Sequence, residues 1–202
     1  KQNLAKFMSQ LCIDNDITGH YVEPYAGGAS VALYLLMEDK VNHITINDYD
    51  RSLYAFWWSV LNRTEHLCNL IESTPVTVSN WKRMKEIQQN KSSAKLIDLG
   101  FSTLFLNRTN RSGILNAGII GGYEQKGQYK IDCRFNKEEI IRRIKCIAKL
   151  KKRITLTQLD ALELIDEVQV ESRNKGEKTI FYFDPPYYLK GPRLYLNSYE
   201  HD

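Results

Sequence analysis

The chain has 202 residues, of which 43% are hydrophobic and 26% are charged, a composition that excludes a disordered protein and is typical of one or two folded domains. The longest apolar run, from Val31 to Met37, is far shorter than the roughly 20 residues that a membrane-spanning helix needs. The first residues do not resemble a signal peptide, so we expect a cytoplasmic protein.

The charges are distributed unevenly along the chain. Residues 1–50 carry 3 basic and 7 acidic side chains, residues 51–153 carry 20 and 8, and residues 154–202 carry 5 and 9. The net charges of the three segments are therefore −4, +12 and −4. Clustered lysine and arginine are the electrostatic signature of phosphate contacts, so the pattern predicts an inserted segment that binds nucleic acid. A basic helical face that is simply solvated is the alternative explanation.

The first third of the chain alternates between helical and strand patterns. We expect a helix at 3–12, a strand at 20–22, a helix at 30–37, a strand at 44–47 and a helix at 53–61. This alternation is typical of a parallel, doubly wound α/β sheet, in which ligands bind beyond the carboxyl ends of the strands. The loops after the two strands are therefore the first candidates for a binding site.

The rest of the chain is predicted to be helical in the middle and α/β at its end. The expected elements are helices at 79–89, 95–106 and 160–168 and strands at 154–158 and 179–183. Five glycines interrupt residues 107–127, which are expected to form a hairpin or an extended loop. Asn136 is expected to cap a further helix, with Glu139 as its capping-box partner, and the basic run 149–153 follows that helix.

The cysteines and histidines do not suggest a disulfide framework or a metal site. Cys12, Cys68, Cys133 and Cys146 lie 56, 65 and 13 residues apart and include no C-x-x-C pair. We expect four buried thiols and no bound metal. The four histidines are isolated in the sequence, so we expect them at structural or surface positions.

The most specific motif is Asp184-Pro185-Pro186-Tyr187, directly after the apolar strand predicted at 179–183. The two prolines stiffen the backbone, so the Asp184 carboxylate and the Pro185 carbonyl form two fixed acceptors beside the ring of Tyr187. Two acceptors and a ring can receive a base that carries an amino group. A rigid proline turn with an aromatic plug is the alternative.

A second motif, residues 23–30, forms a turn between a predicted strand and a predicted helix, where small residues let a ligand approach the backbone. It is not a dinucleotide fingerprint, because Ala29 and Ala32 stand where the spacing from Gly27 requires glycine. Asp48 ends the next strand, where a carboxylate can accept hydrogen bonds from ribose. The pattern predicts an adenosine-bearing cofactor, with a turn packed by small residues as the alternative.

Taken together, the motifs resemble those of the Dam-like (alpha-group) DNA adenine-N6 methyltransferases, in that family's order and over nearly the whole chain. Residues 23–28 resemble the family's cofactor loop, Asp48 with Leu53 its ribose-binding strand end, and residues 184–187 its catalytic motif. Two matches are less specific. Residues 159–161 resemble the segment that contacts the adenine of the cofactor, and residues 107–109 with Ser112 and Gly113 resemble the hairpin that enters DNA.

The resemblance implies S-adenosylmethionine as cofactor, double-stranded DNA as substrate, and methyl transfer to the N6 amino group of a flipped-out adenine. It implies a Rossmann-like α/β sheet domain formed by residues 1–60 and 151–202, with a mainly helical target-recognition domain inserted at 61–150. The implied catalytic residues are Asp184, Pro185, Pro186 and Tyr187. The implied cofactor-binding residues are Lys1, Glu23, Pro24, Tyr25, Ala26, Gly27, Gly28, Asp48, Leu159, Asp160 and Asp184. The expected DNA-binding residues are Asn107, Arg108, Thr109, Asn110, Arg111, Ser112, Lys126 and Lys130. Arg108 and Arg111 are the leading candidates for phosphate contacts, and Lys82, Lys85, Lys126 and Lys130 are the secondary ones.

The chain departs from the family pattern at both ends. Only Lys1 remains of the Pro-Gly-Gly-Lys-like segment with which the family begins, and the family continues with further strands after the catalytic loop. Without those strands, the segment 179–183 would be an exposed apolar sheet edge, which favours aggregation. We therefore expect the chain to be a fragment, with the C-terminal strands of the sheet missing.

Three alternatives stay open on the residues alone. An amino-methyltransferase that acts on cytosine or on RNA could use the same acceptors and ring, although the leading aspartate and the order of the motifs favour adenine in DNA. A catalytically silent module would bind DNA or S-adenosylmethionine without forming product. A nicotinamide dehydrogenase fits the acidic residue after the glycine turn, but not the glycine spacing or the proline loop. The DNA sequence recognised does not follow from these motifs, nor does a biological role such as protection against a partner restriction endonuclease.

Overall fold

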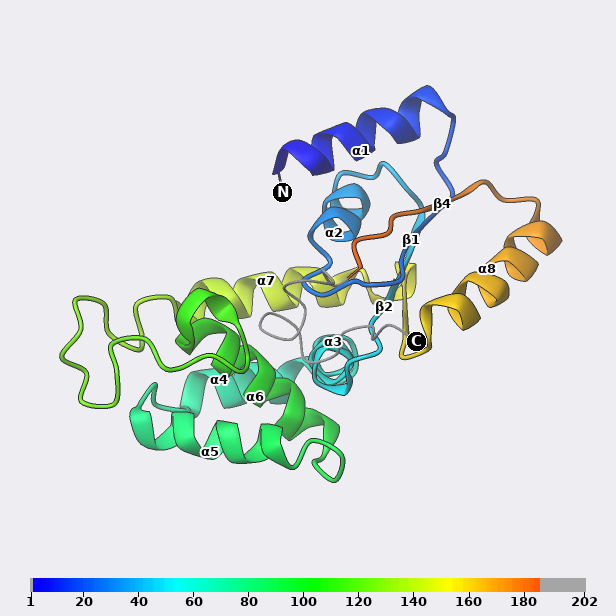
Figure 1. Ribbon diagram of the computed structural model, residues 1–202. Helices are drawn as coiled ribbons and strands as arrows, with labels where there is room; N and C mark the ends of the chain where they lie inside the picture. Colours follow the sequence, from blue (N-terminus) through cyan, green and yellow to red (C-terminus); the bar gives the residue numbers. More distant parts are fainter. Residues whose placement is uncertain (1, 186–202) are drawn as a thin grey trace. The chain divides into compact units, whose positions relative to one another are not determined.

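A computed structural model describes residues 2–185, except for the side chain of Gln2 (Figure 1). These residues divide into two compact units, which we call the sheet unit (residues 2–49 and 150–185) and the helical unit (residues 50–149). The helical unit is thus inserted between two parts of the sheet unit. It begins at residue 50, before the helix that we expected to belong with the sheet, because that helix packs within the helical unit.

The sheet unit contains four parallel strands in the order β3-β2-β1-β4. The strands are β1 (His20–Glu23), β2 (His43–Asn47), β3 (Ile154–Thr157) and β4 (Thr179–Phe181). The helices of this unit are α1 (Gln2–Asp14), α2 (Ser30–Met37), the short η2 (Lys151–Arg153) and α8 (Ala161–Lys175). The predicted α/β fold with a parallel sheet is therefore confirmed.

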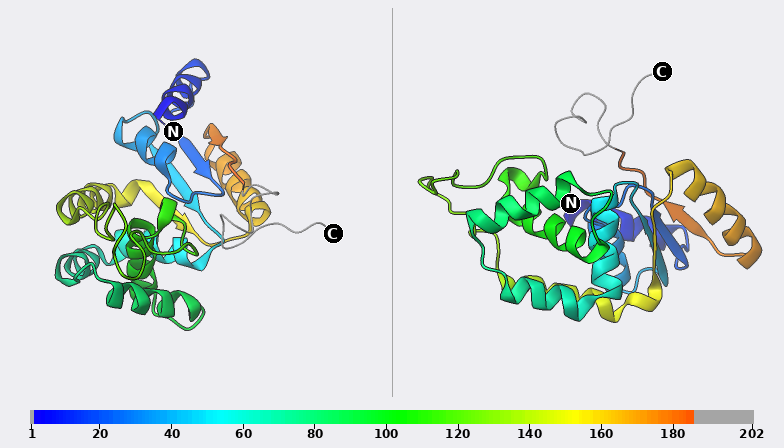
Figure 2. Two further views of the ribbon diagram at one scale, coloured as in Figure 1. Left: turned by 60° about the vertical axis from the view of Figure 1, so that its left-hand side comes forward. Right: turned by 90° about the horizontal axis from the view of Figure 1, so that it is seen from below.

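Helices cover both faces of the sheet because neighbouring residues of β1 point to opposite faces. Val22 packs in a buried cluster with Leu164 and Val168 of α8. The next residue, Glu23, accepts a hydrogen bond from the Ala32 amide of α2 at 3.0 Å. Figures 1 and 2 show α2 and α8 on opposite sides of the strands, as a doubly wound sheet requires.

The strand order reverses between β1 and β4. β1 pairs with β2 on one side, with Val22 opposite Thr45, and with β4 on the other side, with Val22 opposite Phe181. β1 leads through α2 to β2 on one side, whereas the chain returns from β3 through α8 to β4 on the other side. Open α/β sheets bind ligands beyond the carboxyl ends of the strands at such a reversal. The segments that follow Glu23 and Phe181 meet at this point.

Helix α8 is longer than predicted. We expected it to end at residue 168, because the residues that follow are mostly polar. The helix instead continues to Lys175, and residues 169–175 form a largely exposed end of it. Glu171 and Lys175 form an ion pair one turn apart, and Gly176 ends the helix in a left-handed conformation with φ of 61°.

The helical unit contains α3 (Arg51–Asn62), α4 (Thr64–Ser73), α5 (Val78–Gln89), α6 (Leu96–Thr109), the short η1 (Arg111–Gly113) and α7 (Lys137–Lys149). Helix α4 was not predicted.

Helices α3 and α6 approach so closely at Gly100 that a Cβ atom there would lie 2.4 Å from the carbonyl oxygen of Ala55. The Thr103 hydroxyl donates to the Ser52 carbonyl at 3.1 Å across the same contact. Asn136 caps α7 as predicted, accepting from the Glu139 amide at 3.0 Å.

The expectation of a hairpin or loop at 107–127 needs a correction at its start. Residues 107–109 form the last turn of α6, because Thr109 is fully buried and its hydroxyl donates to the Phe105 carbonyl at 2.7 Å. Beyond that turn, Asn110 and Ile119 form an antiparallel bridge, which confirms a hairpin-like return of the chain. We call residues 110–136 the projecting loop, since it extends past the ends of α5 and α6 (Figures 1 and 2).

The expectation of four buried thiols was wrong. Cys12 and Cys68 are buried, but Cys133 is exposed and Cys146 is half-buried. His20 and His43 occupy structural positions, as expected, and adjacent strands bring their rings into edge contact with centroids 5.3 Å apart. None of the described helices has both the length and the apolar character to cross a membrane.

Candidate functional site

The carboxylate of Glu23 lies buried at the end of β1. Its Oε1 atom accepts hydrogen bonds from the Ala32 amide at 3.0 Å and from the Tyr21 hydroxyl at 3.2 Å. Burial first, and then the neighbouring carboxylate, raise the pKa of Tyr21 well above its usual range, so this hydroxyl stays protonated and donates. Glu23 thereby anchors the first turn of α2, where a negative charge is favoured by the helix dipole.

The turn between β1 and α2 leaves open space beside its glycines. The Ala26 amide donates to the Asn47 carbonyl at 2.8 Å, and the Ala29 amide donates to the Ala26 carbonyl at 2.6 Å. Gly27 has φ of 50°, a conformation that favours glycine, and a Cβ atom on Gly27 or Gly28 would meet no other atom within 4 Å. A ligand can therefore approach the backbone here.

Asp48 ties the end of β2 to this turn. Its Oδ2 atom accepts a hydrogen bond from the Gly27 amide at 2.9 Å, and the residue is half-buried. Two of the predicted cofactor-binding positions, which lie 21 residues apart in the sequence, are thus in direct contact.

The sequence analysis missed Asn47, which joins three strand ends. Its side chain is 1% exposed, and its Nδ2 atom donates to the carbonyls of Pro24 at 2.9 Å and Leu159 at 3.0 Å. Its Oδ1 atom accepts from the Thr157 hydroxyl and from the Leu159 amide, both at 2.8 Å. The only signal in the sequence was an amide side chain in a strand whose other residues suit burial.

The predicted residues after β3 have mainly structural contacts. Leu159 packs against the cluster of Val22, Leu164 and Val168. Asp160 caps α8, because its Oδ1 atom accepts from the Leu162 amide at 2.8 Å, and its side chain is exposed. The loop that carries both residues is held to the other strand ends through Asn47.

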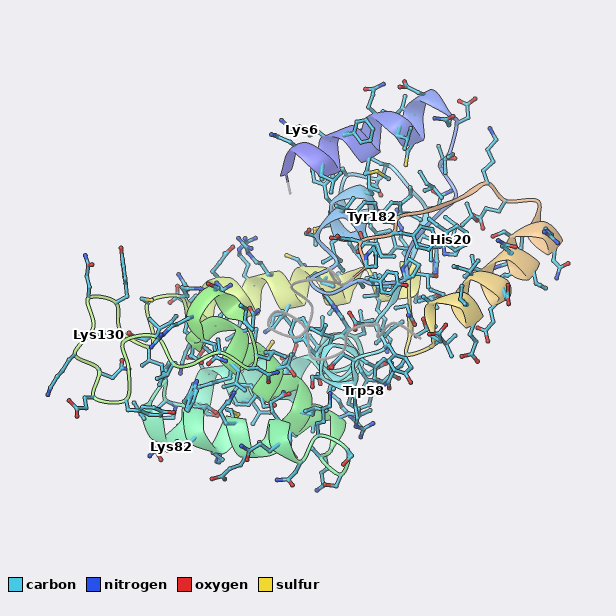
Figure 3. The ribbon with its side chains drawn as sticks, in the orientation of Figure 1. Lys6, His20, Trp58, Lys82, Lys130 and Tyr182 are labelled. Carbon is cyan, nitrogen blue, oxygen red and sulfur yellow. The ribbon has the colours of Figure 1, made fainter. Side chains whose placement is uncertain are left out.

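The segment after β4 brings Asp184 to the end of β1. The Tyr182 amide donates to the Val22 carbonyl at 2.9 Å, so the chain stays beside β1 past the last residue of β4 (Figure 3 labels Tyr182). A small pocket forms there, and its lining residues are Leu4, Glu23, Tyr25, Ala26, Ser30, Val31, Tyr182 and Asp184. Pro185 is exposed, whereas Lys1, Pro186 and Tyr187 lie outside the described residues.

In the helical unit, two predicted DNA-binding residues are buried and act as braces. Asn110 is 0% exposed, accepts from the Trp81 indole at 2.6 Å, and donates from Nδ2 to the carbonyls of Ile114 and Leu115, both at 2.9 Å. Thr109 is also 0% exposed. Their side chains offer no surface to DNA in this conformation. Asn110 attaches the start of the projecting loop to α5, whereas the Thr109 hydroxyl bonds within α6 and only its backbone carbonyl accepts from the loop, at the Ile120 amide.

Arg108 and Lys85 also hold the projecting loop. The half-buried Arg108 donates from Nε to the Arg134 carbonyl at 2.9 Å, and burial followed by the charge of Arg134 lowers the pKa of its guanidinium. Lys85 donates to the Leu115 carbonyl at 3.0 Å and lies 5.7 Å from the centre of the Trp81 ring. Both side chains are half-buried, so only part of each is accessible at the surface.

The remaining predicted DNA-binding residues are exposed. Asn107, Arg111 and Ser112 lie at the end of α6 and the start of the projecting loop. Lys126 pairs with Glu124, and Lys130 donates to the carbonyl of Gln125. Figure 3 shows Lys130 at the outer part of the projecting loop and Lys82 on α5. Part of the positive charge of the segment 51–153 is thus carried by exposed side chains of the projecting loop, namely Arg111, Lys126 and Lys130.

The chain is similar to known proteins in two comparisons. A family model described as D12 class N6 adenine-specific DNA methyltransferase matches residues 1–199. The Type II methyltransferase M.MjaIII of Methanocaldococcus jannaschii is 26% identical over 179 residues, which cover 83% of this chain and 58% of that protein. The chain therefore spans less than two thirds of the length of this relative.

Proposed function

The chain belongs to the D12 class N6 adenine-specific DNA methyltransferase family, and on this premise we propose that it methylates the N6 amino group of adenine in DNA with S-adenosylmethionine as methyl donor. One observation carries the proposal. The reversal of strand order between β1 and β4 brings Glu23, Tyr25 and Asp184 around a single pocket. We assign the sheet unit to cofactor binding and catalysis, and the helical unit to target recognition.

The residues at the pocket suit S-adenosylmethionine, which supplies a methyl group on a sulfonium centre when bound. The open side of the turn at Gly27 and Gly28 accommodates a ligand against the backbone. Asp48, at the end of β2, is placed to accept from ribose hydroxyls, and carboxylates at Glu23 and Asp184 suit a ligand with positively charged groups. We propose these residues, with Pro24, Tyr25 and Ala26, as the cofactor site, supported by the loop at Leu159 and Asp160. Lys1 remains a prediction.

The chemistry proposed for Asp184 is the orientation of the adenine amino group. An adenine in a duplex must first flip out of the stack, at a cost of a few kcal/mol. The Asp184 carboxylate and the Pro185 carbonyl accept the two amino hydrogens, so that the nitrogen lone pair points toward the methyl donor. When bound, S-adenosylmethionine would supply the methyl group: its sulfur–methyl bond would break as the nitrogen–methyl bond forms, and S-adenosylhomocysteine would be released. The surplus proton of the nitrogen would pass to the Asp184 carboxylate and from there to solvent. Stacking of the base on Tyr187, beside Pro186, remains a prediction.

DNA contacts are proposed for the exposed part of the projecting loop. Arg111, Lys126 and Lys130 are the candidates for phosphate contacts, with Asn107 and Ser112 beside the same loop. Arg108, Asn110 and Lys85 would act indirectly, because their side chains hold this loop in place, and the backbone carbonyl of Thr109 accepts from the loop at the Ile120 amide.

The first test is to incubate the full chain with isotopically labelled S-adenosylmethionine and unmethylated DNA, and to identify the labelled nucleoside by mass spectrometry. We expect labelled N6-methyladenine. Labelled N4-methylcytosine would overturn the choice of base. Cofactor binding without a labelled base would favour the catalytically silent module instead.

The role of Asp184 is tested in the same assay by Asp184→Asn, with Asp166→Asn on the exposed side of α8 as matched control. Loss of one charged acceptor should lower the rate by about 100-fold or more, while cofactor affinity changes by only a few fold. The control should keep full activity. Turnover of Asp184→Asn close to that of the unaltered chain would refute the proposed role.

A further inference from the structure

We propose that Asn47 is a positioning residue that holds the cofactor turn and the loop after β3 in the arrangement that S-adenosylmethionine requires. This inference rests on the proposed function. Asn47 lies at the end of β2, between β1 and β3, and does not line the pocket formed by the described residues. Its side chain reaches both neighbouring strand ends.

The side chain of Asn47 replaces backbone pairing where β3 has ended. β3 ends at Thr157, and two residues later the amide of Asn47 pairs with Leu159 in both directions, accepting from its N–H at 2.8 Å and donating to its carbonyl at 3.0 Å. These two bonds also define which atom of the Asn47 amide is the nitrogen. The loop thereby stays in register with β2 beyond the sheet.

The second hydrogen atom on Nδ2 reaches the turn on the other side. It is donated to the Pro24 carbonyl at 2.9 Å, while the backbone carbonyl of Asn47 accepts from the Ala26 amide at 2.8 Å. One buried residue therefore fixes both ends of the Pro24–Ala26 segment and the start of the loop at Leu159. Both segments carry residues that we propose to bind the cofactor.

Replacement of the Asn47 amide should separate the two segments without removing any group that we propose to contact the cofactor or the target adenine. Asn47 uses both hydrogens of Nδ2 and accepts twice at Oδ1. Asn47→Asp keeps the size and the acceptor atoms, but it removes both donors and places a carboxylate against the carbonyls of Pro24 and Leu159. A buried carbonyl that loses its donor is destabilised, and a charge facing it adds repulsion.

Hydrogen exchange of the full chain tests the connection itself, independently of any cofactor. In Asn47→Asp, amides at 26–29 and at 159–162 should exchange faster by about tenfold or more, since both segments lose the same support. The matched control is Thr45→Val, in the middle of β2 and 3% exposed, which removes the hydrogen bond between Thr45 and His20, the first residue of β1. The control should not affect these two segments. Unchanged exchange in Asn47→Asp would overturn the inference.

Cofactor titration and steady-state kinetics then test the function of this connection. We expect Asn47→Asp to raise the Kd and the KM for S-adenosylmethionine by about tenfold or more, with kcat at saturating cofactor within about threefold. Faster exchange with unchanged Kd and KM would reduce Asn47 to a structural residue and overturn the inference. If the unaltered chain bound no S-adenosylmethionine, the proposed function would fail, whereas faster exchange in both segments would still support the connection made by Asn47.

Discussion

Replacement of Asn110 by alanine should release the projecting loop and destabilise the helical unit. The change removes three hydrogen bonds, from the Trp81 indole to Asn110 and from Asn110 to the carbonyls of Ile114 and Leu115, of which the Leu115 carbonyl keeps a bond from Lys85. The two carbonyls belong to half-buried residues and can recover water, whereas Trp81 is only 5% exposed. At about 1 kcal/mol for each lost bond, and somewhat less where water enters, the free energy of unfolding should fall by about 2–3 kcal/mol.

Urea unfolding followed by tryptophan fluorescence measures this loss directly, because the three tryptophans, Trp57, Trp58 and Trp81, all lie in the helical unit. Arg111→Ala is the matched control on the neighbouring exposed residue. It should leave stability unchanged and lower the salt dependence of DNA binding by about one phosphate contact. If Asn110→Ala kept its stability within about 0.5 kcal/mol and still lost DNA binding, Asn110 would contact DNA directly and the bracing role would be refuted.

Three further changes each test the packing within one of the two units. Burial lowers the pKa of His20 from 6.5 to about 4, so the neutral ring stabilises the fold above pH 6.5 and this contribution is lost as the pH falls toward 4. Lowering the pH from 7.5 to 4.5 should therefore reduce the free energy of unfolding by about 2–3 kcal/mol through this group. Urea unfolding at both pH values should show a smaller reduction in His20→Gln than in the unaltered chain. Gly100→Ala should cost the helical unit about 1–3 kcal/mol in urea unfolding because it forces α6 away from Ala55, whereas Gly118→Ala, in open space, should be nearly neutral; equal effects would contradict the close packing. Gly27→Ala should cost about 1–2 kcal/mol through its left-handed backbone alone, and unchanged thermal stability would count against that conformation.

The sequence alone was enough for the class of fold and for the motifs of the site. Strand and helix patterns have different periods, so the alternation of His20–Glu23, Ser30–Met37 and His43–Asn47 was readable without coordinates. The motif at Asp184 was readable for another reason, since two consecutive prolines restrict the backbone whatever surrounds them. The glycine interruptions likewise predicted the projecting loop, because those residues cannot continue a helix at low cost.

Only the tertiary structure decided which polar residues face a ligand and which serve the fold. Asn110 and Arg111 are adjacent polar residues, yet Asn110 is fully buried and hydrogen-bonded to the Trp81 indole, whereas Arg111 is exposed. Asn47 carries no motif, and its importance follows from the order of the strands, which places β1 and β3 on either side of it. Local patterns follow from the chemistry of neighbouring residues, but burial and long-range hydrogen bonds depend on segments more than 100 residues apart, such as Asn47 and Leu159.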